Sequence, residues 1–437
     1  MTRDEAEDYI YESYLAAQPY LRYSDPDSLK RHPELTRDIL RSLAHAPAIV
    51  VTGSKGKGSV ARMVAALLGR SHAVGLMTSP HILKFNERFS VDGKDISDDE
   101  LVSCLEAVKP AFDAVQQGLA PGRFISPIGI ETAIALTWFE RMGTDIDVLE
   151  CGKGARYDDV PNVPHRFAAI NTIFAEHTRE LGPTVGAIAH DKSYVITPGM
   201  EGVFVAPQQD TAMEEIQERA ESEEVPLFCY GRDFEASQVR WGRDGITFDL
   251  RIGARRIEDV RLSLLGEFQA RNAALAVALA VAASETHLAD EEIRDALASV
   301  RMPGRLELLQ EDPPVLLDAC INRASCSQVL DALSHLGIAG GVTTIIGIPD
   351  DKDFLGVADA MKEVSGTIML TASSNPHYVF TEKAHDVLAE QGMASLFVPT
   401  CTDALRQARE IGRPTCILGT TSLISDIERL VRGSVES

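Results

Sequence analysis

The sequence lacks any apolar run approaching the roughly 20 residues that a membrane-spanning helix needs. It also lacks a basic and then apolar leader, because its first residues, MTRDEAEDYIYESY, are acidic. We therefore expect a cytoplasmic protein with no membrane partner. Aromatic residues make up only 6% of the chain, but 45% of its 437 residues are apolar, so it can bury a full core and should divide into two or three domains.

Closely paired cysteines are also missing. The seven cysteines are odd in number, scattered, and never form a CxxC pair, which favours buried free thiols; they are Cys104, Cys151, Cys229, Cys320, Cys326, Cys401 and Cys416.

Basic residues are scarce beside acidic ones. The chain has 42 lysines and arginines against 65 aspartates and glutamates, a formal net charge of −23. This charge would repel a phosphate backbone, so we expect no nucleic-acid partner. A polyanionic ligand would have to be held by local cations and backbone amides.

Two patterns follow one another along the chain. In residues 1–300 we expect a helix over residues 128–143, antiparallel hairpins over residues 237–264, and buried parallel strands at PAIVVTG, HAVGLMT, DIDVLEC and FAAINTI. Residues 314–433 alternate amphipathic helices with apolar strands, namely PVLLDA, VTTIIGI, TIMLTA, SLFVPT and TCILGT. This alternation predicts a parallel, helix-covered sheet of the Rossmann type. Because Pro303 and Gly304 interrupt the pattern, we expect two α/β domains, residues 1–302 and 303–437.

A glycine-rich stretch, VTGSKGKGSVARM, follows the first expected strand. The strand ends at Gly53 and a helix is expected from about Val60 to Leu68, which is the order of a phosphate-binding loop. Glycines allow backbone N–H groups to face one point, the helix N-terminus favours an anion, and Lys57 adds a full charge. The spacing departs from GxxxxGK[ST], since Gly58 separates Lys57 from Ser59. A glycine turn carrying two solvated lysines is the alternative.

Three motifs in order resemble the folylpolyglutamate synthase and dihydrofolate synthase branch of the Mur ligases. They are VTGSKGKGSVARM, GLMTSPHILKFNERFSVDGKDISDDEL and LLGEFQARNAALA. The resemblance implies a P-loop-type ATPase domain, with a parallel sheet and a small antiparallel addition, followed by a Rossmann-like ligase domain. It also implies an ATP-dependent enzyme that phosphorylates a substrate carboxylate, after which an amino acid's amine displaces the phosphate from the acyl phosphate.

The resemblance implies a set of catalytic and metal-binding residues. Lys57, His177 and Lys192 would be catalytic, and the triphosphate would lie against Gly53, Gly56, Lys57, Gly58 and Ser59. One or two Mg²⁺ ions would be held by Ser79, Glu150, His177 and Lys192, the last as a carbamate, and a monovalent cation is left open. Taken singly, these four could instead be a helix N-cap, a strand-end charge, a loop histidine and a surface lysine.

The same resemblance assigns residues that contact the nucleotide and the substrates. Gln269 and Asn272 would contact adenine, Arg305 a phosphate or the ribose, and Asp318 the ribose hydroxyls, although polar residues on the alanine-rich helix of Asn272 could merely be solvated. The acceptor and the amine would be bound by Phe85, Asn86, Arg88, Arg156, Asn322, Asp351, Asn375 and His377.

Departures from the family pattern gather around the acceptor and amine sites. Ile321 replaces a histidine, and His377 stands where an arginine would grip the incoming carboxylate with a bidentate fork. We therefore expect a ligase for small-molecule carboxylates and amines whose acceptor is not a folate, used in a specialised biosynthetic pathway. Two alternatives stay open: a genuine folylpolyglutamate or dihydrofolate synthase that adds glutamate, and a nucleotide-binding partner subunit that no longer ligates. By analogy with the family we expect a monomer.

Overall fold

The computed structural model describes residues 1–22, 25–375, 378–381 and 383–433, and the chain divides into two compact units. The first unit contains Met1–Gln238, Phe248–Val260 and Ala270–Val300, and the second contains Val239–Thr247, Arg261–Gln269 and Arg301–Ser437. The positions that carry the resemblance in the first half of the chain therefore fall in the first unit.

An eight-stranded sheet forms the centre of the first unit, in the order β4-β3-β2-β5-β1-β6-β7-β8. Strands β2, β5, β1, β6, β7 and β8 are parallel, and β3 and β4 add an antiparallel edge. All five residues of β1 are buried, as expected of a strand covered on both faces. The strands are β1 (Ala48–Thr52), β2 (Val74–Met77), β3 (Phe89–Val91), β4 (Lys94–Asp95), β5 (Ile146–Glu150), β6 (Phe167–Ile170), β7 (Gly202–Val205) and β8 (Leu227–Cys229).

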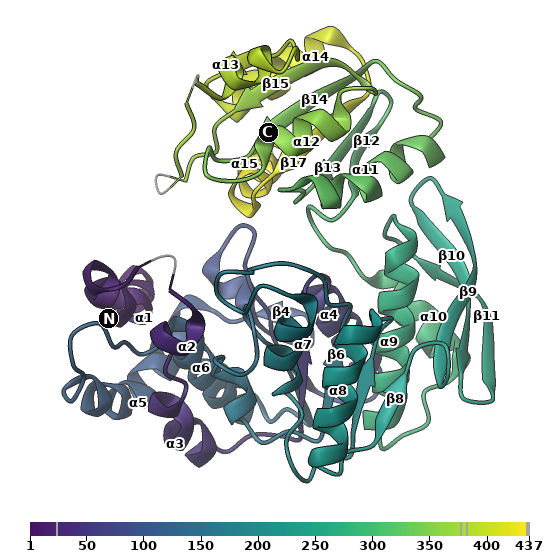
Figure 1. Cartoon of the computed structure of the whole chain (residues 1–437). Coiled ribbons are helices and arrows are strands. Elements are labelled where there is room, and N and C mark those ends of the chain that lie inside the picture. The colour runs from purple at the N-terminus through teal and green to yellow at the C-terminus, as the bar shows by residue number, and fades with distance from the viewer. Residues whose placement is uncertain (23–24, 376–377, 382, 434–437) are drawn as a thin grey trace. The chain divides into compact units, whose positions relative to one another are not determined.

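Helices cover this sheet, and the predicted strands and the predicted helix over residues 128–143 are present. Helices α7 and α8 lie side by side in front of β6 in Figure 1. The helices are α1 (Arg3–Ala17), α2 (Asp27–Lys30), α3 (Glu34–Ser42), α4 (Lys57–Leu68), α5 (Asp98–Gln116), α6 (Pro127–Met142), α7 (Val185–Ser193), α8 (Asp210–Ser222), α9 (Glu267–Ala283) and α10 (Asp290–Ser299). Three short 3₁₀ turns, η1 (Gln18–Tyr20), η2 (Phe85–Arg88) and η3 (Val160–Asn162), lie in the connections.

The hairpin region predicted over residues 237–264 forms a separate three-stranded sheet. Its order is β11-β10-β9, and its strands are β9 (Phe234–Gly242), β10 (Gly245–Ile252) and β11 (Arg255–Leu262). The sheet contributes residues to both units.

The second unit contains a six-stranded sheet in the order β12-β13-β17-β14-β15-β16. The five strands predicted from the sequence are parallel, and β12, which was not predicted, pairs antiparallel with β13 at the edge. The strands are β12 (Glu307–Glu311), β13 (Pro314–Asp318), β14 (Val342–Gly347), β15 (Ser365–Thr371), β16 (Leu396–Val398) and β17 (Thr415–Gly419). The helices are α11 (Arg323–His335), α12 (Phe354–Met361), α13 (Lys383–Glu390), α14 (Cys401–Ile411) and α15 (Thr421–Gly433).

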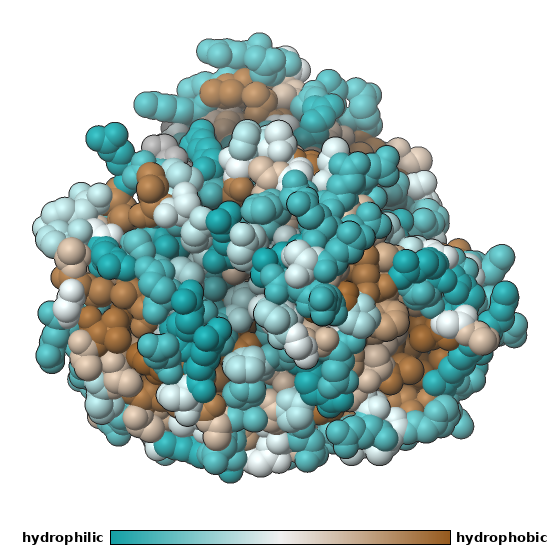
Figure 2. Space-filling model, turned by 60° about the horizontal axis from the view of Figure 1, so that its bottom comes forward, coloured by the Kyte–Doolittle hydropathy of each residue, from teal (hydrophilic) through white to brown (hydrophobic). Residues whose placement is uncertain are grey.

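Hydrophilic side chains cover most of the face shown in Figure 2, and apolar side chains form separate patches between them. Within the described ranges, every helix is too short or too polar to cross a bilayer.

Candidate active site

The glycine-rich stretch forms a tight turn between β1 and α4. Gly56 precedes α4 in the left-handed region with φ of 80°, so the helix begins at Lys57, three residues earlier than predicted. A Cβ at Gly56 would lie 2.6 Å from Nδ2 of Asn171, which leaves no room for a side chain. Because the first N–H groups of a helix have no intrahelical acceptor, this turn presents donors to an anion, as a phosphate loop must.

Two lysine ammonium groups converge on the backbone of this turn. Nζ of Lys57 donates to the carbonyl of Gly53 at 3.2 Å, and Nζ of Lys192 donates to the same oxygen at 2.9 Å. Lys192 is fully buried, donates to the carbonyl of Lys153 at 2.7 Å and pairs with Glu176 at 3.2 Å. Burial, and then the charge of Lys57, lowers the pKa of Lys192 to about 8. The surface-lysine alternative is therefore wrong.

Glu150 and Ser79, two of the predicted magnesium ligands, lie together beside the turn. The backbone N–H of Ser79 donates to Oε2 of Glu150 at 2.9 Å, and a Cβ on Gly58 would lie 3.1 Å from the same oxygen. Glu150 is buried at the end of β5, and Ser79 does not cap a helix. Carboxylate and hydroxyl oxygens close to a phosphate loop fit the ligand preference of Mg²⁺.

His177 lies in the loop after β6, at a positive φ of 46°. His177 is exposed on the surface. The pKa of its imidazole is lowered from the ordinary value, chiefly because neighbouring atoms partly desolvate the ring. Within the described part of the chain, no three histidine, cysteine, aspartate or glutamate side chains gather as a metal site. The role of His177 as a ligand therefore stays a prediction.

Asn272 is brought to the phosphate loop from α9. Its Oδ1 accepts from Nδ2 of Asn171 at 2.9 Å, and Asn171 also donates to the carbonyl of Lys55 at 2.9 Å. Gln269, on the same helix, is fully buried. The suggestion that these polar side chains are merely solvated is therefore wrong, whereas their contact with adenine stays a prediction.

A cavity of about 640 Å³ opens in the first unit, and Ser79, one of its lining residues, contacts Glu150 beside the phosphate loop. Ser79, Gly152 and Lys153 line one part of it. An aromatic part is lined by Tyr11, Tyr14 and Phe124, of which Tyr14 and Phe124 make an edge contact with ring centroids 5.2 Å apart. Its size and mixed lining are those of a small-molecule site.

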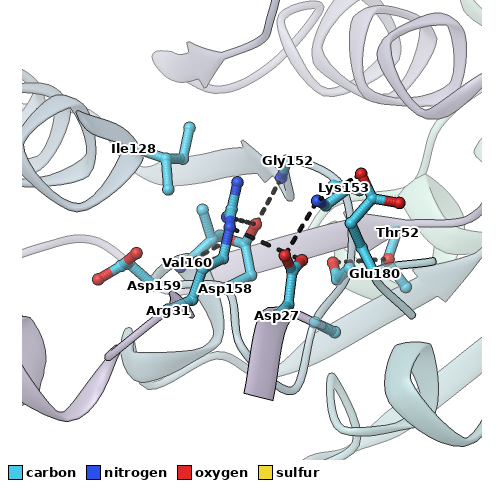
Figure 3. Close-up of polar contacts among 12 residues, drawn as sticks. Asp27, Arg31, Thr52, Ile128, Gly152, Lys153, Asp158, Asp159, Val160 and Glu180 are labelled. Atoms are coloured by element: carbon cyan, nitrogen blue, oxygen red, sulfur yellow. Dashed lines mark hydrogen bonds and ion pairs between the residues drawn. The ribbon is translucent and has the colours of Figure 1, made fainter. Parts of the chain in front are cut away.

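Charged side chains form the polar side of this cavity (Figure 3). Nζ of Lys153 lies 3.0 Å from Oδ1 of Asp27 and 3.6 Å from Oε1 of Glu180. Arg31 lies between two carboxylates, with Nε 3.7 Å from Asp27 and Nη1 3.9 Å from Asp158. We call Asp27, Arg31, Lys153, Asp158 and Glu180 the charged cluster.

Arg88, a predicted acceptor-binding residue, also lines the cavity, but it is engaged by the protein itself. Its Nη1 donates to both oxygens of Glu131 at 2.6 and 2.7 Å, and its Nε donates to Nδ1 of His81 at 3.1 Å. Phe85 and Asn86 do not line the cavity; Phe85 is in the core, and Asn86 donates to the carbonyl of Ile96.

Arg156, the remaining predicted substrate residue of the first unit, lies on the surface. Its guanidinium stacks over the ring of Tyr194 at 4.6 Å, and its Nη1 lies 3.3 Å from Nε2 of His190.

The remaining predicted residues belong to the second unit, where three of them have partners that the sequence did not reveal. Asp318, at the end of β13, accepts from the N–H of Leu306 at 2.9 Å, and Asn322 caps α11 by accepting from the N–H of Ser325 at 3.0 Å. Nδ2 of Asn375 donates to Ser422 at 3.0 Å.

Two further predicted residues also belong to the second unit, and one predicted residue lies outside the described part of the chain. Nη1 of Arg305 contacts the carbonyl of Gly304 at 3.3 Å, and Asp351 is exposed. His377 lies outside the described residues, so its predicted contact with the amine substrate is not addressed.

Known proteins match this chain over part or most of its length. The Mur ligase middle domain matches residues 114–280. A dihydrofolate synthase/folylpolyglutamate synthase of Mycobacterium tuberculosis is 30% identical, over 80% of this chain and 76% of that protein. The chain belongs to the folylpolyglutamate and dihydrofolate synthase family of Mur ligases.

Solved structures of this family superpose on most of the chain. Folylpolyglutamate synthase of M. tuberculosis complexed with ADP and AMPPCP gives a TM-score of 0.83 at 27% identity, over 92% of this chain and 94% of that one. A synthase complex with AMPPCP and folate gives a TM-score of 0.81 at 26% identity, over 99% of this chain and 100% of that one. The chain is therefore an ATP-dependent, amide-forming ligase of this type, and the comparisons favour a genuine folate synthase over the diverged, non-folate enzyme expected from the departures.

The sequence did not point to the charged cluster or to Glu131. Asp27, Arg31 and Lys153 all lie outside the three motifs that carry the resemblance. The one local indication was IGIETAIALTWFERMG, where Glu131 stands in an otherwise apolar helix face. A buried carboxylate needs a cation, and here that cation is Arg88.

Proposed function

We propose that this ligase joins the amine of glutamate to the carboxylate of a folate-type acceptor, either dihydropteroate or tetrahydrofolate, with ATP and Mg²⁺ as cofactors. The observation that carries this proposal is the cavity that ends at Ser79 and Lys153, because both residues contact groups of the phosphate-loop region. An acceptor bound along the aromatic part of the cavity would direct its other end toward the phosphate loop. The folate named in the related complex has this combination of a flat ring and a carboxylate tail.

The residues around the loop fit a bound nucleotide and metal. The N–H groups at the start of α4 and the Lys57 ammonium would hold the phosphates, and oxygens of Ser79 and Glu150 would hold Mg²⁺. Bound there, ATP supplies the phosphoryl group that activates the acceptor carboxylate, and Mg²⁺ neutralises phosphate charge. The ammonium group of Lys57 donates to the carbonyl of Gly53, and this contact with the turn would keep the positive charge close to the phosphates.

Lys192 is well suited to position the turn as an ammonium group. Its three contacts, to the carbonyls of Gly53 and Lys153 and to the carboxylate of Glu176, match the three N–H donors of an ammonium. A carbamate retains only one N–H, so carbamylation would cost two of these contacts and would have to be offset by a metal ion. Carbamylation of Lys192 is our second proposal for this residue, and ¹³C NMR of protein equilibrated with ¹³C-bicarbonate tests it.

The activity is tested by ADP release with ATP, Mg²⁺, one of the two folates, and glutamate. Each carboxylate is crossed with a panel of amino acids, and reactions without an amine measure any simple ATPase activity. We expect ADP release that requires both substrates and is greatest with glutamate. Release with another acid and amine, but with neither folate, would refute the folate acceptor, and ATP binding without turnover on any pair would support the non-ligating alternative.

A further inference from the structure

Two cysteine side chains meet where β13 passes into α11 in the second unit (Figure 1). Sγ of Cys320, two residues after β13, lies 3.4 Å from Sγ of Cys326, the fourth residue of α11. Both residues are fully buried. Their spacing does not predict this contact, because they are six positions apart and belong to no CxxC motif.

The two sulfur atoms are close enough to form a disulfide bond. A disulfide holds its sulfur atoms about 2.0 Å apart, so these two have to approach each other by about 1.4 Å. Cys320 lies in a connection and Cys326 near the start of a helix, so neither is fixed in the middle of a regular element. Rotation of the two side chains and a small adjustment of the connection therefore suffice to close the bond.

Only a thin layer of chain covers these thiols. Ala319, Ile321 and Asn322 are partly exposed, and Arg323 and Ala324, the first residues of α11, are exposed. The first turn of a helix lacks intrahelical acceptors for its N–H groups, and exposed helix ends open at a lower free energy than a packed core. A small oxidant therefore needs only a local opening at this turn to reach the sulfur atoms.

Both thiols contact the same backbone carbonyl group, that of Asn322. Sγ of Cys320 donates to it at 3.6 Å, and Sγ of Cys326 donates to it at 3.7 Å. The side chain of Asn322 also caps α11, accepting from the N–H of Ser325 at 3.0 Å. Because a disulfide has no S–H group, oxidation would remove both donors from this carbonyl and would close a covalent ring around the residue that caps the helix.

We infer that Cys320 and Cys326 are a redox modification site, at which a hydroperoxide converts the two thiols into a disulfide and thereby lowers the activity of the ligase. In the first step, the peroxide takes two electrons from one thiol, its O–O bond breaks, and a sulfenic acid and water or an alcohol are formed. In the second step, the other sulfur attacks the sulfenic sulfur. The S–S bond forms, the S–O bond breaks, and the hydroxide leaves as water with the proton of the attacking thiol.

The loss of activity rests on the proposed function, because Asn322 is a predicted amine-binding residue of the ligase, whereas formation of the disulfide is independent of that function. Misplacing a substrate-positioning group by about 1 Å costs up to about 100-fold in rate, so we expect the oxidised protein to release ADP about 10-fold to 100-fold more slowly. Dithiothreitol should restore the rate, because it reduces the bond by thiol–disulfide exchange.

Peptide mapping tests the bond directly, because Arg323 lies between the two cysteines and trypsin cleaves after it. The tryptic peptide 306–323 holds Cys320 as its one cysteine, and the peptide 324–352 holds Cys326 as its one cysteine. After the whole protein has been treated with hydrogen peroxide and its remaining thiols have been alkylated, we expect these two peptides to be joined. Reduction should separate them.

Two variants connect the bond to the activity. Cys320→Ala and Cys326→Ser should give no joined peptide and should keep their rate of ADP release after peroxide treatment. The serine hydroxyl retains a donor for the carbonyl of Asn322, so this variant keeps the local hydrogen bond. Cys401→Ser is the matched control, because Cys401 belongs to the same unit and is more exposed, at 8%, than either thiol of the pair. It should remain as sensitive to peroxide as the wild-type protein.

Absence of the joined peptides after peroxide treatment would overturn the inference, and so would a bond from Cys326 to Cys416, the third buried cysteine of this core. Inhibition that persists in both variants, or an unchanged rate in protein whose peptides are joined, would also overturn it. Joined peptides in a protein whose reduced form releases no ADP with either folate would support the thiol pair and refute the folate ligase activity.

Discussion

Asp159 should make the protein less stable as the pH rises toward 7, and Asp159→Asn should remove that dependence. Asp159 is 1% exposed, and burial raises the pKa of its carboxyl group from the ordinary 3.8 to about 7. Nearby Asp158 acts in the same direction, whereas hydrogen bonds from Thr36 and Ser126 and the charge of Arg31 oppose it.

The sign follows from which state binds the proton. Between pH 3.8 and about 7 the folded protein holds a proton on Asp159 that the unfolded chain has released, so stability falls as the pH rises through this range. At about 1.36 kcal/mol per pH unit, the total reaches at most about 4 kcal/mol. The asparagine variant does not titrate, and its amide can be accommodated because the Thr36 hydroxyl donates to one oxygen and the Ser126 hydroxyl can turn to accept from the NH₂.

Urea denaturation at pH 5 and pH 8 measures this difference. We expect wild type to lose more free energy of unfolding between the two pH values than Asp159→Asn does, and the variant to be the more stable at pH 8. Asp158→Asn is the contrasting control, since both oxygens of Asp158 accept backbone N–H groups, from Gly152 at 3.0 Å and Val160 at 3.1 Å. An amide there would oppose one N–H and should destabilise at both pH values. Equal pH dependence in wild type and Asp159→Asn would refute the reasoning.

Three further changes test the site. Lys57→Ala should lower kcat/KM for ATP about 100-fold or more, because it removes the phosphate-facing charge, whereas Lys55→Ala should have a much smaller effect in the same ADP-release assay. Lys192→Ala should abolish turnover, with partial rescue by a short carboxylic acid if the carbamate is formed; full activity of this variant would exclude a catalytic role. Glu131→Leu should lower the free energy of unfolding by about 3–5 kcal/mol, because it leaves the Arg88 guanidinium buried without its carboxylate. Adding Arg88→Met to this variant should restore much of the lost stability. Thermal unfolding of the single and double variants measures this recovery, and a double variant no more stable than Glu131→Leu would contradict the prediction.

The strands of both sheets could be predicted from the sequence because parallel strands buried on both faces appear as short apolar runs. β1 and β17 are examples in which all five residues are buried. The sequence predicts the start of α4 too late because glycine favours a loop, whereas the left-handed Gly56 ends the loop and Lys57 begins the helix. Strand β12 cannot be predicted from an apolar run because only its pairing with β13 defines it, and none of its five residues is buried, three being partly buried and two exposed.

The phosphate-loop side of the site could also be predicted, since its residues follow one another within motifs. Glu150 and Ser79 were assigned separately from motif positions, and the structure brings them into contact because β2 and β5 are neighbouring parallel strands whose carboxyl ends meet at one edge. The acceptor side could not be predicted in this way. Phe85 and Asn86 belong to the same motif as Arg88, but the 3₁₀ turn η2 directs both of them into the protein. Of these three residues, Arg88 alone lines the cavity.

Lys153 shows why spacing along the chain is a poor guide to the acceptor side. Its carbonyl accepts from Lys192, next to the phosphate loop, while its ammonium binds Asp27, which is 126 positions away in the sequence. The N–H of Asp27 in turn donates to the carbonyl of Glu180, so α2 is held to the loop that follows β6 by both backbone and side chain. The same lysine therefore borders the acceptor cavity and supports the buried lysine of the nucleotide side. A substitution such as Lys153→Met should consequently affect both sides.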